Sequence, residues 1–138
     1  MKRFEGKVQL VLYPFAFSDR SAVAAQVAWC AGEQGKFWEV HHMLYQRQET
    51  WSRFEDPLDR LVGYSERLGV EADTLRSCVK SGRMKPLIQA DKELGRSLQV
   101  RSTPTIFINN QRSVGVQPEA DYVRMIRQEL SRAQRNQQ

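Results

Sequence analysis

The stretch from Val100 to Asn110 constrains the fold more than any other part of the chain. It reads Val-Arg-Ser-Thr-Pro-Thr-Ile-Phe-Ile-Asn-Asn, with a proline before a short apolar run and a turn signal after it. Proline has no N–H to donate to a sheet, so it belongs at the first position of a strand. We therefore predict a strand over residues 105–108 that is entered through Pro104 and leads into a tight hairpin.

The residues alone leave two interpretations of the Thr103–Pro104 bond. It is either the trans bond of an ordinary strand entry, or a cis bond, which folded proteins use as a deliberate feature. A bend at this point would expose the backbone of Ser102 and Thr103 for pairing with another segment.

The composition excludes several classes of protein. The 138 residues suffice for one domain with a real core, and 41% apolar with 27% charged residues is typical of a globular chain. No apolar run approaches the roughly 20 residues that span a bilayer, so we expect no membrane-embedded part. The net charge of +5 is scattered. The densest group of basic residues lies near the C-terminus and comprises Arg124, Arg127, Arg132 and Arg135. Their spacing indicates a solvated helix face rather than a nucleic-acid site.

The N-terminus carries no signal-peptide pattern. Met1-Lys2-Arg3 is basic, but Glu5, Lys7 and Gln9 interrupt the residues that follow. We expect a cytoplasmic protein as the chain stands, and a periplasmic or extracellular one if a leader has been omitted.

Few residues suggest metal or nucleophile chemistry. Cys30 and Cys78 lie far apart and form no Cys-x-x-Cys or metal-binding spacing. His41 and His42 are adjacent, so on a helix they point in different directions. We therefore predict no metal site, no cofactor and no catalytic residue, and interpret both histidines as structural or surface residues. Phe37 and Trp38 are interpreted as core residues.

Hydrophobic periodicity and turn signals predict the order of the elements. The run from Lys7 to Tyr13 is almost continuously apolar after Gln9, which is typical of a strand buried on both faces. Helical patterns follow, and after the proline strand come a second hairpin strand and a helix beginning at Pro118-Glu119. The expected helices cover residues 21–31 with Ser18 or Asp19 as cap, 36–48, 56–68 with Asp56 as cap, 73–82 with Asp73 as cap, and 85–98. The second hairpin strand is expected at 112–116, and the tail from 132 to 138 is expected to be frayed. The pattern is α/β with a helical insertion.

Three segments together resemble one known family, the DsbA-like thiol–disulfide oxidoreductases. The segment from Cys30 to His41, with its Gly-Lys-Phe-Trp-Glu block, resembles a helical segment of that family, and Leu75 to Gly82 resembles its next helix. Val100 to Asn109 resembles its cis-proline loop and the following strand. The match covers nearly the whole chain in the right order and spacing.

The resemblance implies a thioredoxin-like sheet with an inserted helical domain. Residues 1–17 and 99–138 would form a partial thioredoxin-like domain, incomplete because the first strand is missing, and residues 18–98 the helical insertion. Pro104 would be the cis-proline, with Ser102 and Thr103 in the loop that binds a substrate or partner. Some relatives carry a structural disulfide where Cys30 and Cys78 lie. Two unlinked buried cysteines are the alternative.

The departure from the family concerns its Cys-x-x-Cys pair, which would lie upstream of the strand matching Val8 to Tyr13. We therefore expect a protein without its own dithiol redox activity that retains the cis-proline loop as a peptide- or partner-binding surface. The alternatives are a fragment of an active oxidoreductase whose Cys-x-x-Cys lies upstream, and a relative of the glutathione-dependent isomerases and transferases. The missing central strand leads us to expect direct pairing of the remaining strands or a homodimer that completes the sheet.

Overall fold

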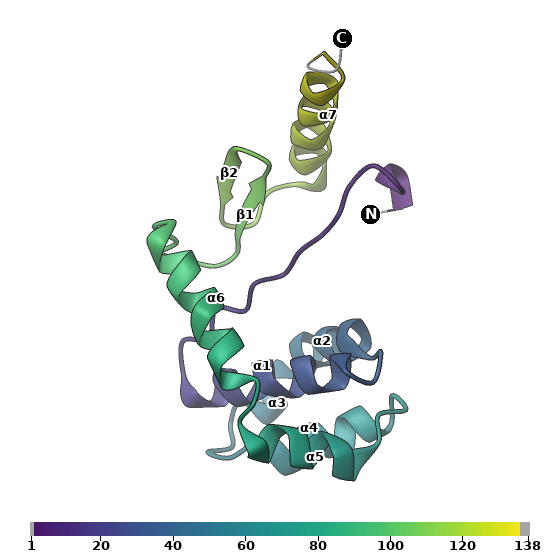
Figure 1. Ribbon diagram of the computed structural model, residues 1–138, viewed down its shortest axis with the longest axis vertical. Coiled ribbons are helices and arrows are strands. Elements are labelled where there is room, and N and C mark those ends of the chain that lie inside the picture. Colours follow the sequence, from purple (N-terminus) through teal and green to yellow (C-terminus); the bar gives the residue numbers. More distant parts are fainter. Residues whose placement is uncertain (1, 136–138) are drawn as a thin grey trace. The chain divides into compact units, whose positions relative to one another are not determined.

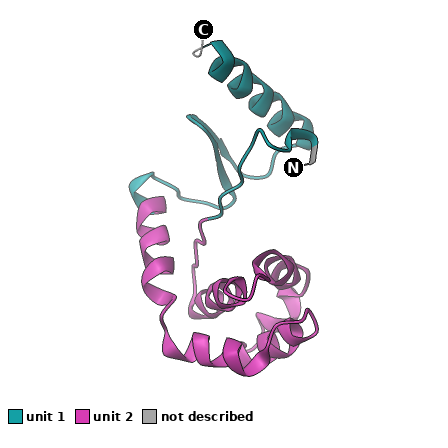
Figure 2. Ribbon diagram, turned by 45° about the vertical axis from the view of Figure 1, so that its right-hand side comes forward, with its two compact units in different colours: residues 1–12, 96–138 teal, residues 13–95 magenta. Residues whose placement is uncertain are grey.

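The computed structural model describes residues 2–135 (Figure 1). The elements follow in the order η1 (Lys2–Phe4), α1 (Asp19–Gly32), α2 (Phe37–Gln46), α3 (Gln48–Trp51), α4 (Leu58–Glu66), α5 (Ala72–Ser81), α6 (Lys85–Ser97), β1 (Thr105–Ile108), β2 (Gln111–Val114) and α7 (Glu119–Arg135). The chain divides into two compact units, residues 1–12 with 96–138 and residues 13–95 (Figure 2).

The helical unit, residues 13–95, is built around α1. Ser18, one of the two expected candidates, caps this helix. Its hydroxyl accepts a hydrogen bond from the Ser21 N–H at 3.2 Å, and the Ser21 hydroxyl accepts one from the Ser18 N–H at 2.9 Å. Such a reciprocal box satisfies two backbone donors that the first helical turn leaves without partners. The helix then presents a run of small side chains that lets α2, α4 and α5 pack closely against it.

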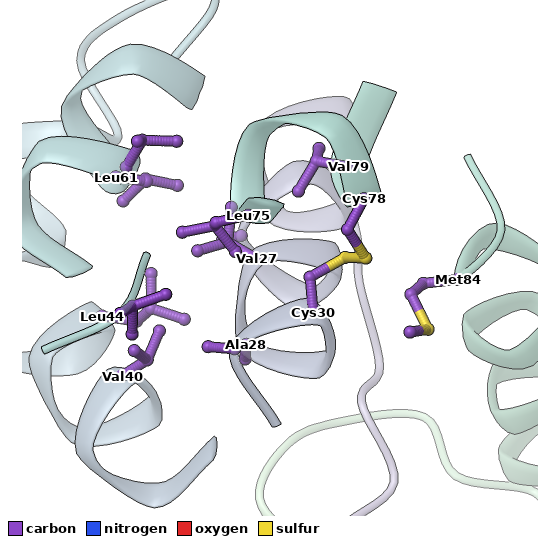
Figure 3. Close-up of a cluster of buried hydrophobic side chains, with 14 of the residues drawn as sticks. Val27, Ala28, Cys30, Val40, Leu44, Leu61, Leu75, Cys78, Val79 and Met84 are labelled. Carbon is purple, nitrogen blue, oxygen red and sulfur yellow. A yellow bond between two sulfur atoms is a disulfide. The ribbon is translucent and has the colours of Figure 1, made fainter. Parts of the chain in front are cut away.

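The core of the helical unit lies where α1 meets α2, α4 and α5 (Figure 3). Val27, Leu61 and Leu75 have no exposed surface at all. Each side chain of this size contributes about 1.5–3 kcal/mol when it is removed from water. Trp51 lies in α3 and is buried, and its indole Nε1–H keeps a partner there by donating to the Leu44 carbonyl at 2.7 Å.

Two caps in this unit differ from the sequence expectation. The N-cap of α5 is Glu71 rather than Asp73, because its carboxylate reaches the N–H groups of both Asp73 and Thr74, at 3.0 and 2.6 Å. The Thr74 side chain, followed by the N–H groups of Thr74 and Asp73, lowers the pKa of Glu71 below its usual value. Asp56 does contact the start of α4, and its Oδ1 accepts from the Leu58 N–H at 3.0 Å, but Pro57 precedes the helix rather than opening it.

The other unit contains the hairpin and α7. β1 and β2 are antiparallel, with Ile108 opposite Gln111 and Thr105 opposite Val114, and they form the whole sheet of the described residues. The turn at Asn109-Asn110 is as predicted, with Asn109 in the left-handed region at φ 51°. β2 spans residues 111–114 rather than 112–116, since Gly115 turns the chain at φ 77°.

The strand expected over residues 7–13 is absent, so this prediction is wrong. Residues 8–17 form no ladder, and Leu10, Val11 and Tyr13 are each more than half exposed. A strand exists only where a neighbour takes its backbone hydrogen bonds. None of the described residues pairs with this segment, and the direct pairing expected between it and β1 does not occur.

Glu129 fixes α7 against the hairpin. It is 8% exposed, and its carboxylate accepts from Gln111 Nε2 at 2.7 Å and Asn109 Nδ2 at 3.2 Å. Arg132 pairs with the same carboxylate at 2.6 Å, and α7 continues to Arg135, so the described part of the expected frayed tail is helical. The bonds from Gln111 and Asn109 lower the pKa of Glu129 below its usual value.

We expect Glu129→Gln to lower the urea midpoint of unfolding at pH 7, because the neutral amide cannot accept both side-chain bonds as strongly as a carboxylate. The wild-type advantage should shrink as the pH falls below 4.5, the ordinary value for this group, and vanish below its lowered folded-state pKa. Urea titrations at pH 7 and at about pH 3, well below the reference pKa of glutamate, measure this. Glu119→Gln is the matched control, because that side chain is 85% exposed on the same helix. An equal loss in both variants would contradict the anchoring role.

Candidate functional site

The proline loop joins α6 to β1 and lies wholly at the surface. Ser102, Thr103 and Pro104 are exposed, and the peptide bond between Thr103 and Pro104 is cis. The Thr105 hydroxyl donates to the Ser102 carbonyl at 2.7 Å, which closes the loop on itself. Among the described residues, neither the N–H nor the C=O of Thr103 has a hydrogen-bond partner.

One backbone hydrogen bond sets which groups of β1 point outward. The Gly115 N–H donates to the Pro104 carbonyl at 2.8 Å, so these two residues extend the ladder by one hydrogen-bonded pair. Antiparallel pairs alternate between bonded and non-bonded, so Ile106 and Ile108 direct their backbone groups to β2. The backbone groups of Thr105 and Phe107 therefore point away from β2. Together with the unpaired backbone of Thr103, just before the strand, they form what we call the free edge of β1.

The two faces of the hairpin differ. By register, Ile106, Ile108, Gln111 and Ser113 share the face toward α7, where Gln111 bonds Glu129 and Ser113 is buried. Thr105, Phe107, Arg112 and Val114 share the other face, where Phe107 is 43% and Val114 49% exposed. The free edge therefore borders a face on which the apolar side chains of Phe107 and Val114 remain partly exposed.

Arg112 fastens the hairpin to the end of α6. Its guanidinium donates to the carbonyls of Leu98 and Gln99 at 3.2 and 2.7 Å, and it lies 5.7 Å from the centre of the Phe107 ring. Since α6 leads directly into the proline loop, these bonds hold the loop's entry against the strand that follows it. No motif in the sequence indicates this role.

The two cysteines are joined, which confirms the structural disulfide. The Cα atoms of Cys30 and Cys78 are 5.9 Å apart, and both residues are 1% exposed (Figure 3). The bridge links α1 to α5. Glu33 Oε2 lies 3.7 Å from the Cys78 sulfur, and its carboxylate is held by Arg83. A buried disulfide beside a carboxylate is a poor centre for exchange, because thiols cannot reach it and negative charge opposes thiolate formation.

His41 and His42 lie on α2 among aromatic rings rather than beside a nucleophile. His41 stacks on Phe37 with ring centres 5.7 Å apart and contacts Tyr45 at 5.1 Å. Burial, followed by the neighbouring charge of His42, lowers the pKa of His41 below its usual value. Phe37 packs against Trp29 at the edge of the core, whereas Trp38 is 41% exposed and so is not the core residue that was expected.

No cluster of metal-ligating side chains occurs within residues 2–135. In the same range, no helix has the length and apolar character needed to cross a bilayer.

Comparison with known families identifies the class of protein. The family model described as "Thioredoxin" matches residues 2–128, so the chain belongs to that family. The family match establishes the predicted fold class, a thioredoxin-like fold with inserted helices. The family match and the relatives described next confirm the resemblance to DsbA-like oxidoreductases.

The chain is 23% identical over 128 residues to "Putative protein-disulfide oxidoreductase RT0103" of Rickettsia typhi, covering 92% of this chain and 46% of that protein. It is 24% identical over 114 residues to "Putative protein-disulfide oxidoreductase RP025" of Rickettsia prowazekii, covering 82% and 40%. It is 38% identical over 93 residues to "Na(+)/H(+) antiporter NhaA 1" of Salinispora arenicola, covering 67% and 14%. The chain thus spans less than half the length of each of these relatives. No solved structure matches it.

Removing the disulfide should destabilise the helical unit. The bridge spans 48 positions, so Cys30→Ala with Cys78→Ala should lower the free energy of unfolding by about 4 kcal/mol on the chain-entropy model. Urea unfolding with tryptophan fluorescence measures the loss, and reductant should reproduce it in the wild type but leave the double variant unchanged. Thiol counting is the control. Two free thiols in an air-oxidised sample would show that the bridge does not form.

Proposed function

We propose that this chain is a thioredoxin-fold protein that binds an extended polypeptide along the free edge of β1, beside the Ser102-Thr103-Pro104 loop, and has no dithiol redox activity of its own. The observation that carries the proposal is the set of backbone groups at Thr103, Thr105 and Phe107 without partners among the described residues, of which those of Thr105 and Phe107 point away from β2. An incoming strand pairs with such a row through main-chain hydrogen bonds, while the neighbouring side chains select its sequence.

The exposed apolar face supports the same role. A backbone edge by itself binds any extended chain weakly, and affinity comes from side chains that lose water on binding. Phe107 lies directly at the free edge with 43% of its surface exposed. Large aromatic side chains of this kind are enriched among the residues that dominate binding energy.

The cysteine arrangement supports the absence of dithiol activity. The chain contains two cysteines, and they are bonded to each other in the core of the helical unit. Thiol–disulfide exchange requires an accessible thiolate that attacks a substrate sulfur and a second thiol that resolves the mixed disulfide. Neither sulfur of this chain meets the first condition.

The binding surface can be mapped by residue-resolved NMR with a cysteine-free ten-residue peptide of alternating valine and threonine. We expect the amides of Thr103, Thr105 and Phe107 to shift and to exchange more slowly with solvent, while those of Ile106 and Ile108 stay protected throughout. Phe107→Ser should weaken binding roughly tenfold, the cost of losing about 1.4 kcal/mol of apolar contact. Val114→Ser is the matched control, since Val114 is similarly exposed on the same face but lies on β2. Changes confined to β2, or equal losses in both variants, would refute the binding edge.

A second copy of the chain is the other partner that this edge suits, and pairing of two such edges would give the homodimer expected from the sequence. Light scattering separates the two cases. If the protein is a stable monomer at micromolar concentration and still binds the peptide, polypeptide binding is supported and the homodimer is excluded.

The chain should not catalyse insulin reduction by dithiothreitol above the rate without protein. Insulin turbidity measures this, with the same concentration of the Cys30→Ala, Cys78→Ala variant as control. A wild-type rate clearly above that of the variant would overturn the redox-inactive part of the proposal without touching the binding edge.

A second candidate function is favoured by how little of its relatives the chain spans. It covers 46% of the Rickettsia typhi protein. In this version the chain forms the polypeptide-binding part of an oxidoreductase whose Cys-x-x-Cys lies in residues outside these 138. An in-frame Cys-x-x-Cys codon run upstream of Met1 would favour this version over the first.

A further inference from the structure

The unit that carries the hairpin also holds a concave basic surface, which we call the arginine cleft. It comprises two adjoining hollows of about 710 and 410 Å³ between α7 and the N-terminal residues. Both hollows are lined by Arg3, Arg127 and Ser131. The N-terminal residues and α7 belong to the same compact unit (Figure 2).

The lining of the arginine cleft contains several basic side chains and no acidic one. Its lining includes six basic side chains, Arg3, Lys7, Arg124, Arg127, Arg132 and Arg135, and no aspartate or glutamate. Three of the six are paired with acids outside the lining, Arg3 with Glu119, Arg124 with Asp121 and Arg132 with Glu129. Within residues 2–135 the other three, Lys7, Arg127 and Arg135, have no acidic partner. Among the described residues, nothing acidic therefore compensates these three positive charges.

Helix geometry places these groups in a row. Arg124, Arg127, Ser131 and Arg135 are spaced three, four and four residues apart, which puts them on one face of α7. At 1.5 Å per residue the row is about 16 Å long. The Ser131 hydroxyl and the Gln128 amide add neutral donors between the guanidinium groups.

The chemistry of the row selects its ligand. Guanidinium groups bind phosphate oxygens with paired, charge-assisted hydrogen bonds. One exposed ion pair contributes about 0–1 kcal/mol, so a single phosphate gains little, whereas linked phosphates engage several cations at once. A cleft of this size fits a small ligand rather than the flat surface of a membrane. A single-stranded nucleic acid requires stacking rings beside the cations, and the aromatic lining residue, Phe4, is buried.

We propose that the arginine cleft binds a compact polyphosphate-type anion, with Arg127 at its centre because it lines both hollows. The cleft lies on α7 and the N-terminal residues, and no residue of the free edge of β1 lines it. This site therefore stands or falls independently of the polypeptide-binding function.

Inorganic tripolyphosphate is the probe, titrated calorimetrically into the full chain at 50 mM NaCl. We expect saturable binding that weakens at least tenfold at 300 mM NaCl, because exposed charges are screened by salt. Arg127→Gln should weaken binding by tenfold or more and Arg135→Gln by a smaller factor, while Arg67→Gln should change it by less than twofold. Arg67 is the matched control, an exposed arginine of the helical unit whose loss lowers the net charge equally. Circular dichroism verifies that each variant is folded.

Three results would overturn the proposal. The first is no saturable binding of tripolyphosphate by the wild type. The second is an equal loss in Arg127→Gln and Arg67→Gln, which would assign the binding to net charge alone. The third is tighter binding of a ten-residue oligothymidine than of tripolyphosphate with the same dependence on Arg127, which would make the cleft a nucleic-acid site.

Discussion

The hydrogen bond from the Gly115 N–H to the Pro104 carbonyl determines most of what the hairpin unit presents. It fixes the phase of the antiparallel ladder, and the phase decides which backbone groups of β1 are used by β2 and which remain at the free edge. The missing N–H of Pro104 also limits the ladder. With no N–H of its own, Pro104 cannot complete the pair, so the ladder ends there, and the backbone of Thr103 finds no partner among residues 2–135.

The two units are stabilised by different means. In the helical unit, fully buried side chains such as Leu61 and Leu75 and the Cys30–Cys78 bridge hold four helices together. The hairpin unit has a two-stranded sheet, which is at best marginally stable alone, and relies on polar anchors instead. Glu129 ties α7 to the turn, and the Tyr122 hydroxyl accepts from the Gln117 N–H at 3.0 Å and donates to the Gly115 carbonyl at 3.2 Å. Binding surfaces are commonly drawn from the less stable part of a structure.

How much the sequence predicts depends on the range of the interaction involved. Some local signals were correct: the Ser18 cap and the Asn109-Asn110 turn depend on neighbouring residues alone. The Asp73 cap was wrong because the carboxylate of Glu71, two residues earlier, reaches the same helix start. The strand expected at residues 7–13 failed because β-propensity describes a fit to neighbours, and the described chain supplies none. The roles of Glu129 and Arg112 were missed for the complementary reason. Glu129 is a buried carboxylate that accepts hydrogen bonds from the side chains of a turn about 20 residues earlier in the chain. Such a long-range contact produces no periodic pattern in the sequence.

The position of Arg112 constrains how copies of the chain can add to the free edge of β1. An exposed strand edge beside an apolar face is a template on which further copies can add without limit. Arg112 places a permanent positive charge over the Phe107 ring, on that same face. Stacking copies in register would bring like charges together at every step, while a single foreign strand with an acidic residue at that point would gain an ion pair. A charged side chain at such a position is a feature that disfavours the in-register stacking of identical strands.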